Sequence, residues 1–163
     1  FTAEEMWAAM PAIARDADSV HLSSWYVENP EFINAELDSK WDKIIKLRKE
    51  VNKVLEKARQ GENRIIGNSL DAEVSLFIGN DEYKSLLADK ELLEMIFIIS
   101  KLNIVETKDD SFTESEELKD ISIKVAHATG EKCERCWKYS EELGTHEEHS
   151  TICPRCTGVL VNN

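Results

Sequence analysis

The chain has 163 residues, 42% of them hydrophobic, which is enough apolar material for a buried core and excludes a disordered tail. Its net charge of −12 argues against non-specific binding of polyanions, which needs a basic surface. The longest apolar run, residues 95–99, is too short to cross a bilayer and no signal peptide is found, so we expect a soluble protein without a membrane partner. The chain opens on Phe1 within an amphipathic segment, which indicates a piece of a longer protein.

Charge is unevenly distributed along the chain. Residues 40–64 contain nine Lys and Arg against four acidic residues, a net charge of +5 that leaves −17 for the rest of the chain. A basic island on an acidic body either docks on nucleic acid or forms the solvated face of a helix. Charge alone favours the solvated face.

The first segment, residues 1–10, is predicted to be a helix with a capping box, in which Thr2 is the N-cap and Glu5 follows three residues later. Pro11 ends this helix, because proline lacks the backbone N–H that a helix interior requires. Residues 15–32 are predicted to be a loop, since aromatic residues and a proline lie there among polar residues.

A long amphipathic helix is predicted from about residue 35 to residue 60, and Gly61 ends it. Its apolar side chains recur every three or four residues and are expected to form one buried stripe: Ile44, Leu47, Val51, Val54, Leu55 and Ala58. Four lysines are placed on the opposite face: Lys46, Lys49, Lys53 and Lys57. The pattern thus separates a buried face from a charged one.

The middle of the chain predicts a small α+β unit with the element order β-α-α-β-β. In chain order these are a strand at 72–78, a helix capped by Asn80 that runs to about 88, a helix at 90–100, a strand at 103–107, an acidic loop or hairpin at 108–119 and a strand at 121–125. Alternation places residues 72, 74, 76 and 78 on one face of the first strand, so this strand is expected to be buried on one side only.

The composition changes at Gly130, after which all four cysteines follow. They form two C-x2-C pairs separated by sixteen residues: Cys133, Cys136, Cys153 and Cys156. Two such turns, brought together by a hairpin, surround one zinc ion with four thiolates, the pattern of a zinc ribbon. A tail this small needs such a metal because it cannot bury enough apolar surface of its own. The closed set of four ligands leaves no position for substrate, so the expected role is structural.

Other uses of these cysteines fit the sequence less well. Disulfides would suit a secreted protein, and nothing marks this chain as secreted. A redox pair would need a larger α/β domain around a single C-x-x-C. His146 and His149 are alternative metal ligands, but four cysteines already fill the shell, so both are expected on the surface. His21 and His127 have no partner pattern, no phosphate-binding glycine loop or nucleophile motif is present, and no catalytic residue is predicted.

Three stretches of the chain resemble bacterial isoleucyl-tRNA synthetases, and they occur in the family's order. Residues 130–137, GEKCERCW, followed by 152–156, ICPRC, are similar to the C-terminal zinc finger of that family. Residues 1–7, FTAEEMW, resemble a stretch near the end of its anticodon-binding helical bundle. Residues 47–59 and 66–74 resemble the helix and strand that follow the bundle. The resemblance therefore covers essentially the whole chain.

The resemblance implies a C-terminal fragment of a cytoplasmic class I ligase that joins isoleucine to its tRNA with ATP. The ATP site of that class carries HIGH-like and KMSKS-like motifs, and this chain has neither. The expected fold is α+β: a partial helical bundle and long helix in residues 1–64, a junction unit in 65–128, and a zinc-ribbon finger in 129–163. The expected partners are the anticodon stem-loop of tRNA-Ile and the remainder of the synthetase, and the one cofactor is a structural zinc ion.

Unpaired anticodon bases stack on aromatic rings and on Arg planes, which singles out Trp137, directly after the first cysteine pair. Trp137 either stacks a base or covers the core of the ribbon. Its basic neighbours are Arg135, Lys138 and Arg155, although Arg155 has the alternative role of balancing thiolate charge. The lysines of the long helix, Lys46, Lys49, Lys53 and Lys57, are expected to contact the RNA backbone if they contact RNA at all.

Two other functions remain open at this point. The same finger resembles that of formamidopyrimidine-DNA glycosylases, which grip duplex DNA around a flipped base. That family carries an Arg shortly before the second cysteine pair and a basic domain before the finger. Here residues 147–150 are EEHS, and the preceding unit is acidic. A zinc-stapled protein-interaction module would also suit the acidic body.

Overall fold

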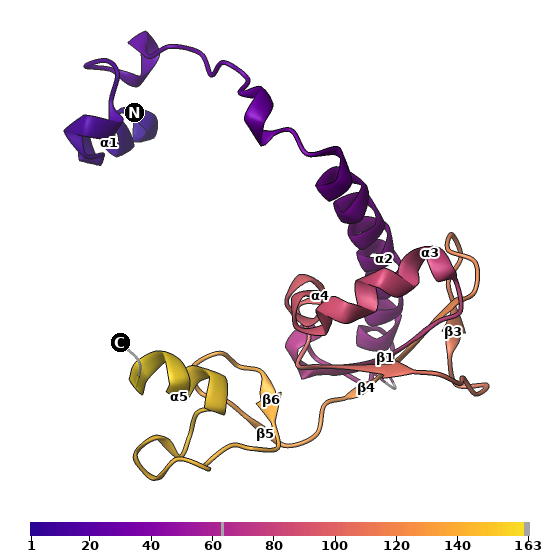
Figure 1. Cartoon of the computed structure of the whole chain (residues 1–163). Helices are drawn as coiled ribbons and strands as arrows, with labels where there is room; N and C mark the ends of the chain where they lie inside the picture. The colour runs from indigo at the N-terminus through magenta and orange to yellow at the C-terminus, as the bar shows by residue number, and fades with distance from the viewer. Residues whose placement is uncertain (63, 162–163) are drawn as a thin grey trace. The chain divides into compact units, whose positions relative to one another are not determined.

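A computed structural model describes residues 1–62 and 64–161 of the chain. The described residues form two compact units, Phe1–Ala35 and the part that begins at Glu36. In this part of the chain no helix is both long enough and apolar enough to pass through a membrane. The structure is mixed α and β with a four-cysteine cluster near its end, which confirms the predicted fold class (Figure 1).

The first unit contains helix α1, Thr2–Ala9, and three short 3-10 turns at Ala12–Ala14, Val20–Leu22 and Pro30–Phe32. The predicted capping box is wrong. Phe1 is the N-cap, without a side-chain cap, and its carbonyl accepts the Glu5 N–H at 3.1 Å. The helix therefore begins one residue earlier than the box requires, and Thr2 already lies inside it. Met10 is extended, as expected for the residue before a proline.

The first unit has no fully buried residue. Its contacts are local: the Trp7 indole N–H donates to the Ala17 carbonyl at 3.0 Å, and the Ser19 hydroxyl donates to Glu4 at 2.6 Å. Several large apolar side chains are exposed on it: Phe1, Met6, Ile13, Leu22, Trp25, Tyr26, Val27, Phe32 and Ile33. A segment with so little buried surface has no core of its own to stabilise it.

The second unit packs helices on one mixed sheet. Its elements are α2 (Ala35–Arg59), a 3-10 turn at Ser69–Asp71, β1 (Ala72–Ile78), α3 (Asp81–Lys84), a 3-10 turn at Ser85–Asp89, α4 (Lys90–Phe97), β2 (Lys101–Val105), β3 (Thr113–Glu114) and β4 (Ile121–His127). The strand order is β2-β1-β4-β3, with β1 and β2 parallel and the other pairs antiparallel. In Figure 1 the helices lie above this sheet.

The core joins the stripe of α2 to the sheet. All six predicted stripe residues of α2 are buried, and so are the four alternating residues of β1. They pack with α4, β2 and β4 in one apolar cluster, to which Phe97, Leu102 and Ile123 contribute fully buried side chains. Both periodicities were therefore confirmed. The burial of the α2 stripe removes it from water and stabilises the fold through the hydrophobic effect.

Several predicted boundaries in the middle of the chain were shifted. Strand β2 begins at Lys101 rather than 103, because the buried Leu102 pairs with Val74 of β1 and fixes the register. Helix α4 ends at Phe97, since Ile98 adopts a left-handed conformation with φ 57° and turns the chain toward β2. The helix capped by Asn80 is a single α-turn followed by the 3-10 turn. The acidic excursion, predicted as a loop or a hairpin, contains β3, which pairs antiparallel with β4.

A buried carboxylate fastens the acidic excursion to the long helix. Glu50 of α2 is 2% exposed, and its Oε2 accepts the Ser115 hydroxyl at 2.6 Å, the Glu116 N–H at 2.8 Å and the Glu117 N–H at 3.3 Å. Its Oε1 forms an ion pair with Lys53 Nζ at 2.6 Å. Burial raises the pKa of Glu50, but these donors outweigh it and hold the pKa at about 2.

Glu50→Gln tests this anchor. The depressed pKa means that the carboxylate stabilises the fold fully above pH 4.5, and that this contribution is lost as the pH falls toward 2. We expect the substitution to lower the free energy of unfolding by about 2 kcal/mol at pH 7 and to have little effect near pH 2. Urea unfolding of both proteins, followed over this pH range by circular dichroism, measures the difference.

The matched control is Glu56→Gln on the same helix. The Glu56 carboxylate is 57% exposed and, among the described residues, forms an ion pair only with Arg59, three residues away, so its removal should change stability by less than about 0.5 kcal/mol. An equal loss of unfolding free energy in both variants at pH 7 would show that the buried contacts of Glu50 stabilise the fold no more than an exposed ion pair does.

Candidate metal centre and nucleic-acid interface

The finger consists of a short hairpin and a helix. Strands β5 (Glu131–Lys132) and β6 (Tyr139–Ser140) pair antiparallel, and the first cysteine pair lies in the turn that joins them. That turn is closed by two backbone hydrogen bonds, from the Cys133 N–H to the Lys138 carbonyl and from the Trp137 N–H to the Cys133 carbonyl, each 2.9 Å. The second pair begins helix α5 (Pro154–Val161), whose proline stands at the first helical position, where no N–H is needed.

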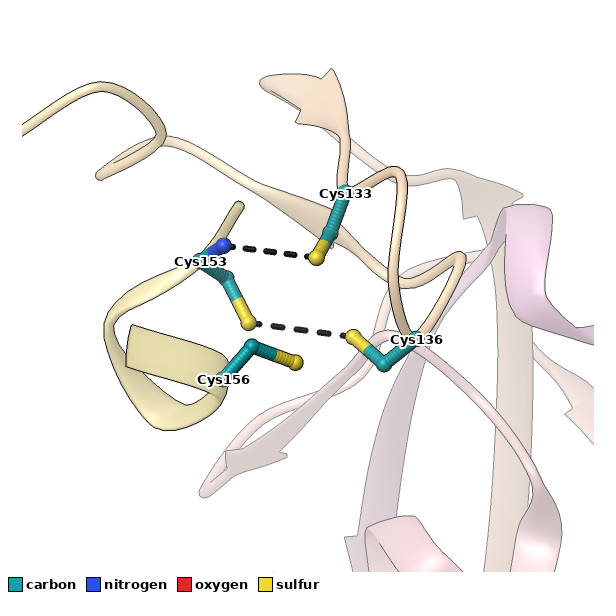
Figure 2. Close-up of side chains that lie close together, drawn as sticks. All are labelled: Cys133, Cys136, Cys153 and Cys156. Atoms are coloured by element: carbon teal, nitrogen blue, oxygen red, sulfur yellow. Dashed lines mark hydrogen bonds between the residues drawn. The ribbon is translucent and has the colours of Figure 1, made fainter. Parts of the chain in front are cut away.

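The two turns bring the four sulfurs together. All four Sγ atoms lie within 4.8 Å of one another, and Figure 2 shows them pointing toward a common centre. Cys136 Sγ and Cys153 Sγ are 3.7 Å apart, close to the ~3.8 Å separation that a tetrahedral site with Zn–S bonds of about 2.3 Å requires. The backbone N–H of Cys153 also donates to Cys133 Sγ at 3.3 Å, as thiolate ligands in such turns require.

The ionisation of these thiols fits a cation at their centre. Burial raises the pKa of Cys133, but backbone N–H groups of residues 135, 136 and 153 outweigh it and lower the pKa to about 6. Burial raises the pKa of Cys136 to about 12, and it also raises the pKa of Cys156. Four thiolates in one buried site repel one another, so a divalent cation is needed to hold all four ionised. The donor set suits zinc, and it is closed by protein sulfur.

The two predicted surface histidines are separate from this cluster. The rings of His146 and His149 stack on each other with centroids 5.3 Å apart. Within the described residues, the group that can hold a metal ion consists of the four cysteines and includes neither histidine.

Trp137 projects from the first turn into solvent. Its side chain is 61% exposed, whereas the cysteines of the finger pack with Leu143 and Ile152. Its backbone is left-handed, with φ 65°, a conformation that costs a bulky L-residue about 1–2 kcal/mol and that glycine adopts freely. The fold therefore holds a large aromatic ring outward at a position where glycine would be less strained.

The basic candidates of the finger are not neutralised by carboxylates. Arg135, Lys138 and Arg155 form no ion pair with the described part of the chain. The Arg135 guanidinium donates a long hydrogen bond, 3.5 Å, to the Cys156 carbonyl and also interacts with the Cys156 thiol. Lys138 and Arg155 line a recess of about 240 Å³ between the finger and α4.

Most of the predicted lysines of α2, unlike the cations of the finger, form ion pairs with carboxylates. Lys49 pairs with Glu117 at 2.9 Å, and Lys53 pairs with Glu50, Glu116 and Glu117. Lys57 pairs with Glu116 at 3.5 Å. Lys46 alone among the four predicted lysines has no ion pair with the described residues. The acidic excursion thus covers most of the charge that the sequence placed on this helix face.

The sequence did not reveal the residues that attach the finger to the junction unit. The Ser100 hydroxyl accepts the Tyr139 N–H at 2.7 Å and donates to the Leu70 carbonyl. Two ion pairs of 3.7 Å cross the same seam, Lys132 with Asp71 and Lys101 with Glu141. These are single polar residues at strand ends, and no periodicity or motif distinguishes them from solvated ones.

Comparison with known proteins places each part of the chain. Residues 130–157 match the family described as the zinc finger found in FPG and IleRS, and residues 1–76 match the anticodon-binding domain of tRNA ligase. Isoleucine–tRNA ligase of Desulforamulus reducens is 41% identical over 98% of this chain, and that of Thermotoga petrophila is 40% identical over 98%. The isoleucine–tRNA ligase of Syntrophotalea carbinolica is 39% identical over 99%.

The chain spans only 17% of the length of each of these relatives. The finger match does not separate a ligase from a DNA glycosylase, because its family includes both. The anticodon-binding match and the similarity along the whole chain do separate them, and both favour the ligase. The chain belongs to the isoleucine–tRNA ligase family, as the segment that contains the end of the anticodon-binding domain and the zinc finger.

Proposed function

We propose that this segment recognises the anticodon region of tRNA-Ile within a cytoplasmic isoleucine–tRNA ligase. One observation carries the proposal: the turn of the first cysteine pair presents the exposed ring of Trp137 on the same finger as three cations, Arg135, Lys138 and Arg155, that have no carboxylate partner among the described residues. The isoleucine- and ATP-dependent chemistry is assigned to the remainder of the synthetase, since this chain carries no catalytic motif. The proposed parts are the bundle end and long helix in 1–64, the junction unit in 65–128 and the finger in 129–163.

Stacking explains the placement of Trp137. Unpaired bases gain about 1–3 kcal/mol each by stacking on an aromatic ring, whatever the base. The turn that carries Trp137 is fixed by two backbone hydrogen bonds and by the two cysteines that precede it, so the backbone loses little conformational entropy on binding. Arg135, Lys138 and Arg155 supply positive charge for the phosphates next to the stacked base.

The long helix contributes less than its charge suggests. Lys49, Lys53 and Lys57 reach an RNA phosphate only by leaving Glu116 and Glu117, which offsets most of the gain. We therefore assign a backbone contact to Lys46 before the other three. The exposed apolar side chains of the first unit are assigned a different partner, the remaining helices of the anticodon-binding domain in the parent chain.

We propose one structural zinc ion in the four-cysteine site. Removal of zinc with a chelator should unfold residues 131–161 and leave the core of α2 and the sheet intact, because the buried cluster of the finger consists of the cysteines themselves, whereas α2 and the sheet share a separate apolar core. Metal analysis should give one zinc per chain, and amide NMR signals should be lost from the finger only. Zinc affinity should fall as the pH is lowered, since protons compete for the thiolates.

Two substitutions sharpen this test. Cys153→Ser should abolish stoichiometric zinc, whereas His149→Ala should retain it. A chain that contains no zinc when purified without chelator, or that loses zinc on His149→Ala, would contradict the four-cysteine site.

Trp137→Gly tests stacking without straining the turn. In the full-length ligase, we expect kcat/KM for tRNA-Ile to fall by about 5- to 100-fold, the equivalent of one lost stacking contact. Zinc content and thermal stability should not fall, because glycine relieves the left-handed backbone. Trp137→Phe, which keeps an aromatic face, should retain most of the activity. Unchanged charging by the glycine variant would leave Trp137 without a role in tRNA recognition.

The competing functions separate by ligand. The full-length ligase should prefer tRNA-Ile to duplex DNA, with an affinity that decreases as salt increases. Filter binding or fluorescence anisotropy at two salt concentrations measures both ligands. Equal affinity for duplex DNA would favour a glycosylase-like grip, and affinity for neither would favour the protein-interaction module.

A further inference from the structure

One lysine of the finger faces two aromatic rings. Lys132 lies on β5, directly before Cys133, and its Nζ is 6.0 Å from the ring centroid of Trp137 and 5.9 Å from that of Tyr139. Tyr139 is itself held by an edge-on contact with His127 at the end of β4, with centroids 5.0 Å apart. The ammonium group therefore stands between a fixed ring and the exposed ring of Trp137, at the distance of a cation–π contact.

A buried carboxylate holds the same lysine from the other side. Asp71 is 8% exposed, and its Oδ2 accepts the backbone N–H groups of Gly67 and Asn68, each at 3.0 Å. Burial raises the pKa of Asp71, but these donors and Lys132 outweigh it, so the group is charged at neutral pH. Its Oδ1 lies 3.7 Å from Lys132 Nζ. Asp71 is thus a fixed negative charge in the junction unit that holds the Lys132 ammonium group near the ring of Trp137.

We propose that Lys132 is a positioning residue: held by Asp71, it covers one face of Trp137 and orients the ring so that a single RNA base stacks on the other face. This inference rests on the proposed stacking role of Trp137. It goes beyond that role, since the direction of the Trp137 ring is then set by the junction unit as well as by the turn of the first cysteine pair.

The physical argument concerns the freedom of an exposed ring. The backbone turn fixes where the Trp137 side chain begins, but a side chain that is 61% exposed has little packing to select its rotamer. A cation above one face favours the rotamers that keep this face toward it. The same cation prevents a base from entering on that side. The ring then offers one face rather than two, and binding loses less rotamer entropy.

The direct alternative is that Lys132 contacts a phosphate. Its side chain is 42% exposed, so the ammonium group is accessible from solvent. The two roles differ in measurable ways, because a phosphate contact changes the salt dependence of binding and acts independently of Trp137. Loss of a positioning contact changes the orientation and the solvent exposure of the Trp137 ring.

The first arm of the test observes the ring. The chain contains four tryptophans, so incorporation of 5-fluorotryptophan gives four 19F NMR resonances, and Trp137→Phe assigns one of them. We expect Lys132→Met to shift the Trp137 resonance and to increase its solvent isotope shift, and Lys132→Arg to restore both. Lys101→Met removes the other ion pair of the seam and should leave the Trp137 resonance in place. Zinc content confirms that each variant retains the finger.

The second arm measures tRNA-Ile binding by the full-length ligase. Lys132→Met should weaken binding by about twofold to fivefold, the size of one exposed cation–π contact. The slope of log affinity against log salt should not change, whereas loss of a phosphate contact reduces it by nearly one. In the Trp137→Ala background, Lys132→Met should have no further effect, because the two residues act as one.

The outcomes distinguish the two proposals. An unchanged Trp137 resonance in Lys132→Met overturns the positioning role, and so does a reduced salt slope with an effect that persists without Trp137. If Trp137→Ala leaves tRNA binding intact, the stacking function falls, and the 19F arm alone then decides whether Lys132 orients the ring.

Discussion

The fold of the finger depends on one constraint, which is that its four cysteine sulfurs come together at one point. Among the described residues, its buried cluster consists of cysteines, with the partly buried Leu143 and Ile152 packed against it. Such a cluster does not offset the conformational entropy of more than thirty residues, and the proposed zinc ion would supply the difference. The hairpin turn and the start of α5 are fixed only because both carry ligands. That turn fixes the backbone position from which the Trp137 side chain projects.

The finger is attached to the rest of its unit by polar contacts, whereas the long helix is attached by apolar ones. Ser100 and two ion pairs cross the seam, and each is specific in direction but contributes little energy. The stripe of α2, by contrast, is buried against the sheet. The core therefore stabilises the unit, and the seam orients the finger on it. A substitution in the seam should alter recognition more than stability.

Local repetition explains which features the sequence predicted. The period of α2 and the alternation in β1 lie within short windows, and the structure confirmed both. The spacing of the cysteines is equally local, and the four sulfurs meet. Strand β4 is present, but its burial does not alternate, because Ser122 is buried as fully as Ile121 and Ile123. The contacts of Glu50 join residues about 65 positions apart, and those of Lys132 depend on how two elements meet. No local pattern marks such residues. The start of β2 was missed for the same reason, since Leu102 sets it by pairing with another strand.

These long-range contacts change the meaning of the charge pattern. The sequence shows a basic helix on an acidic chain, and the structure shows that three carboxylates, Glu50, Glu116 and Glu117, pair with three lysines of that helix. The finger cations keep no such partner. An acidic body repels the phosphate backbone over much of its surface, so attraction depends on the cations that have no carboxylate partner among the described residues. Arg135, Lys138 and Arg155 of the finger are three of these cations. Under the proposed binding, repulsion from the acidic surface adds to specificity.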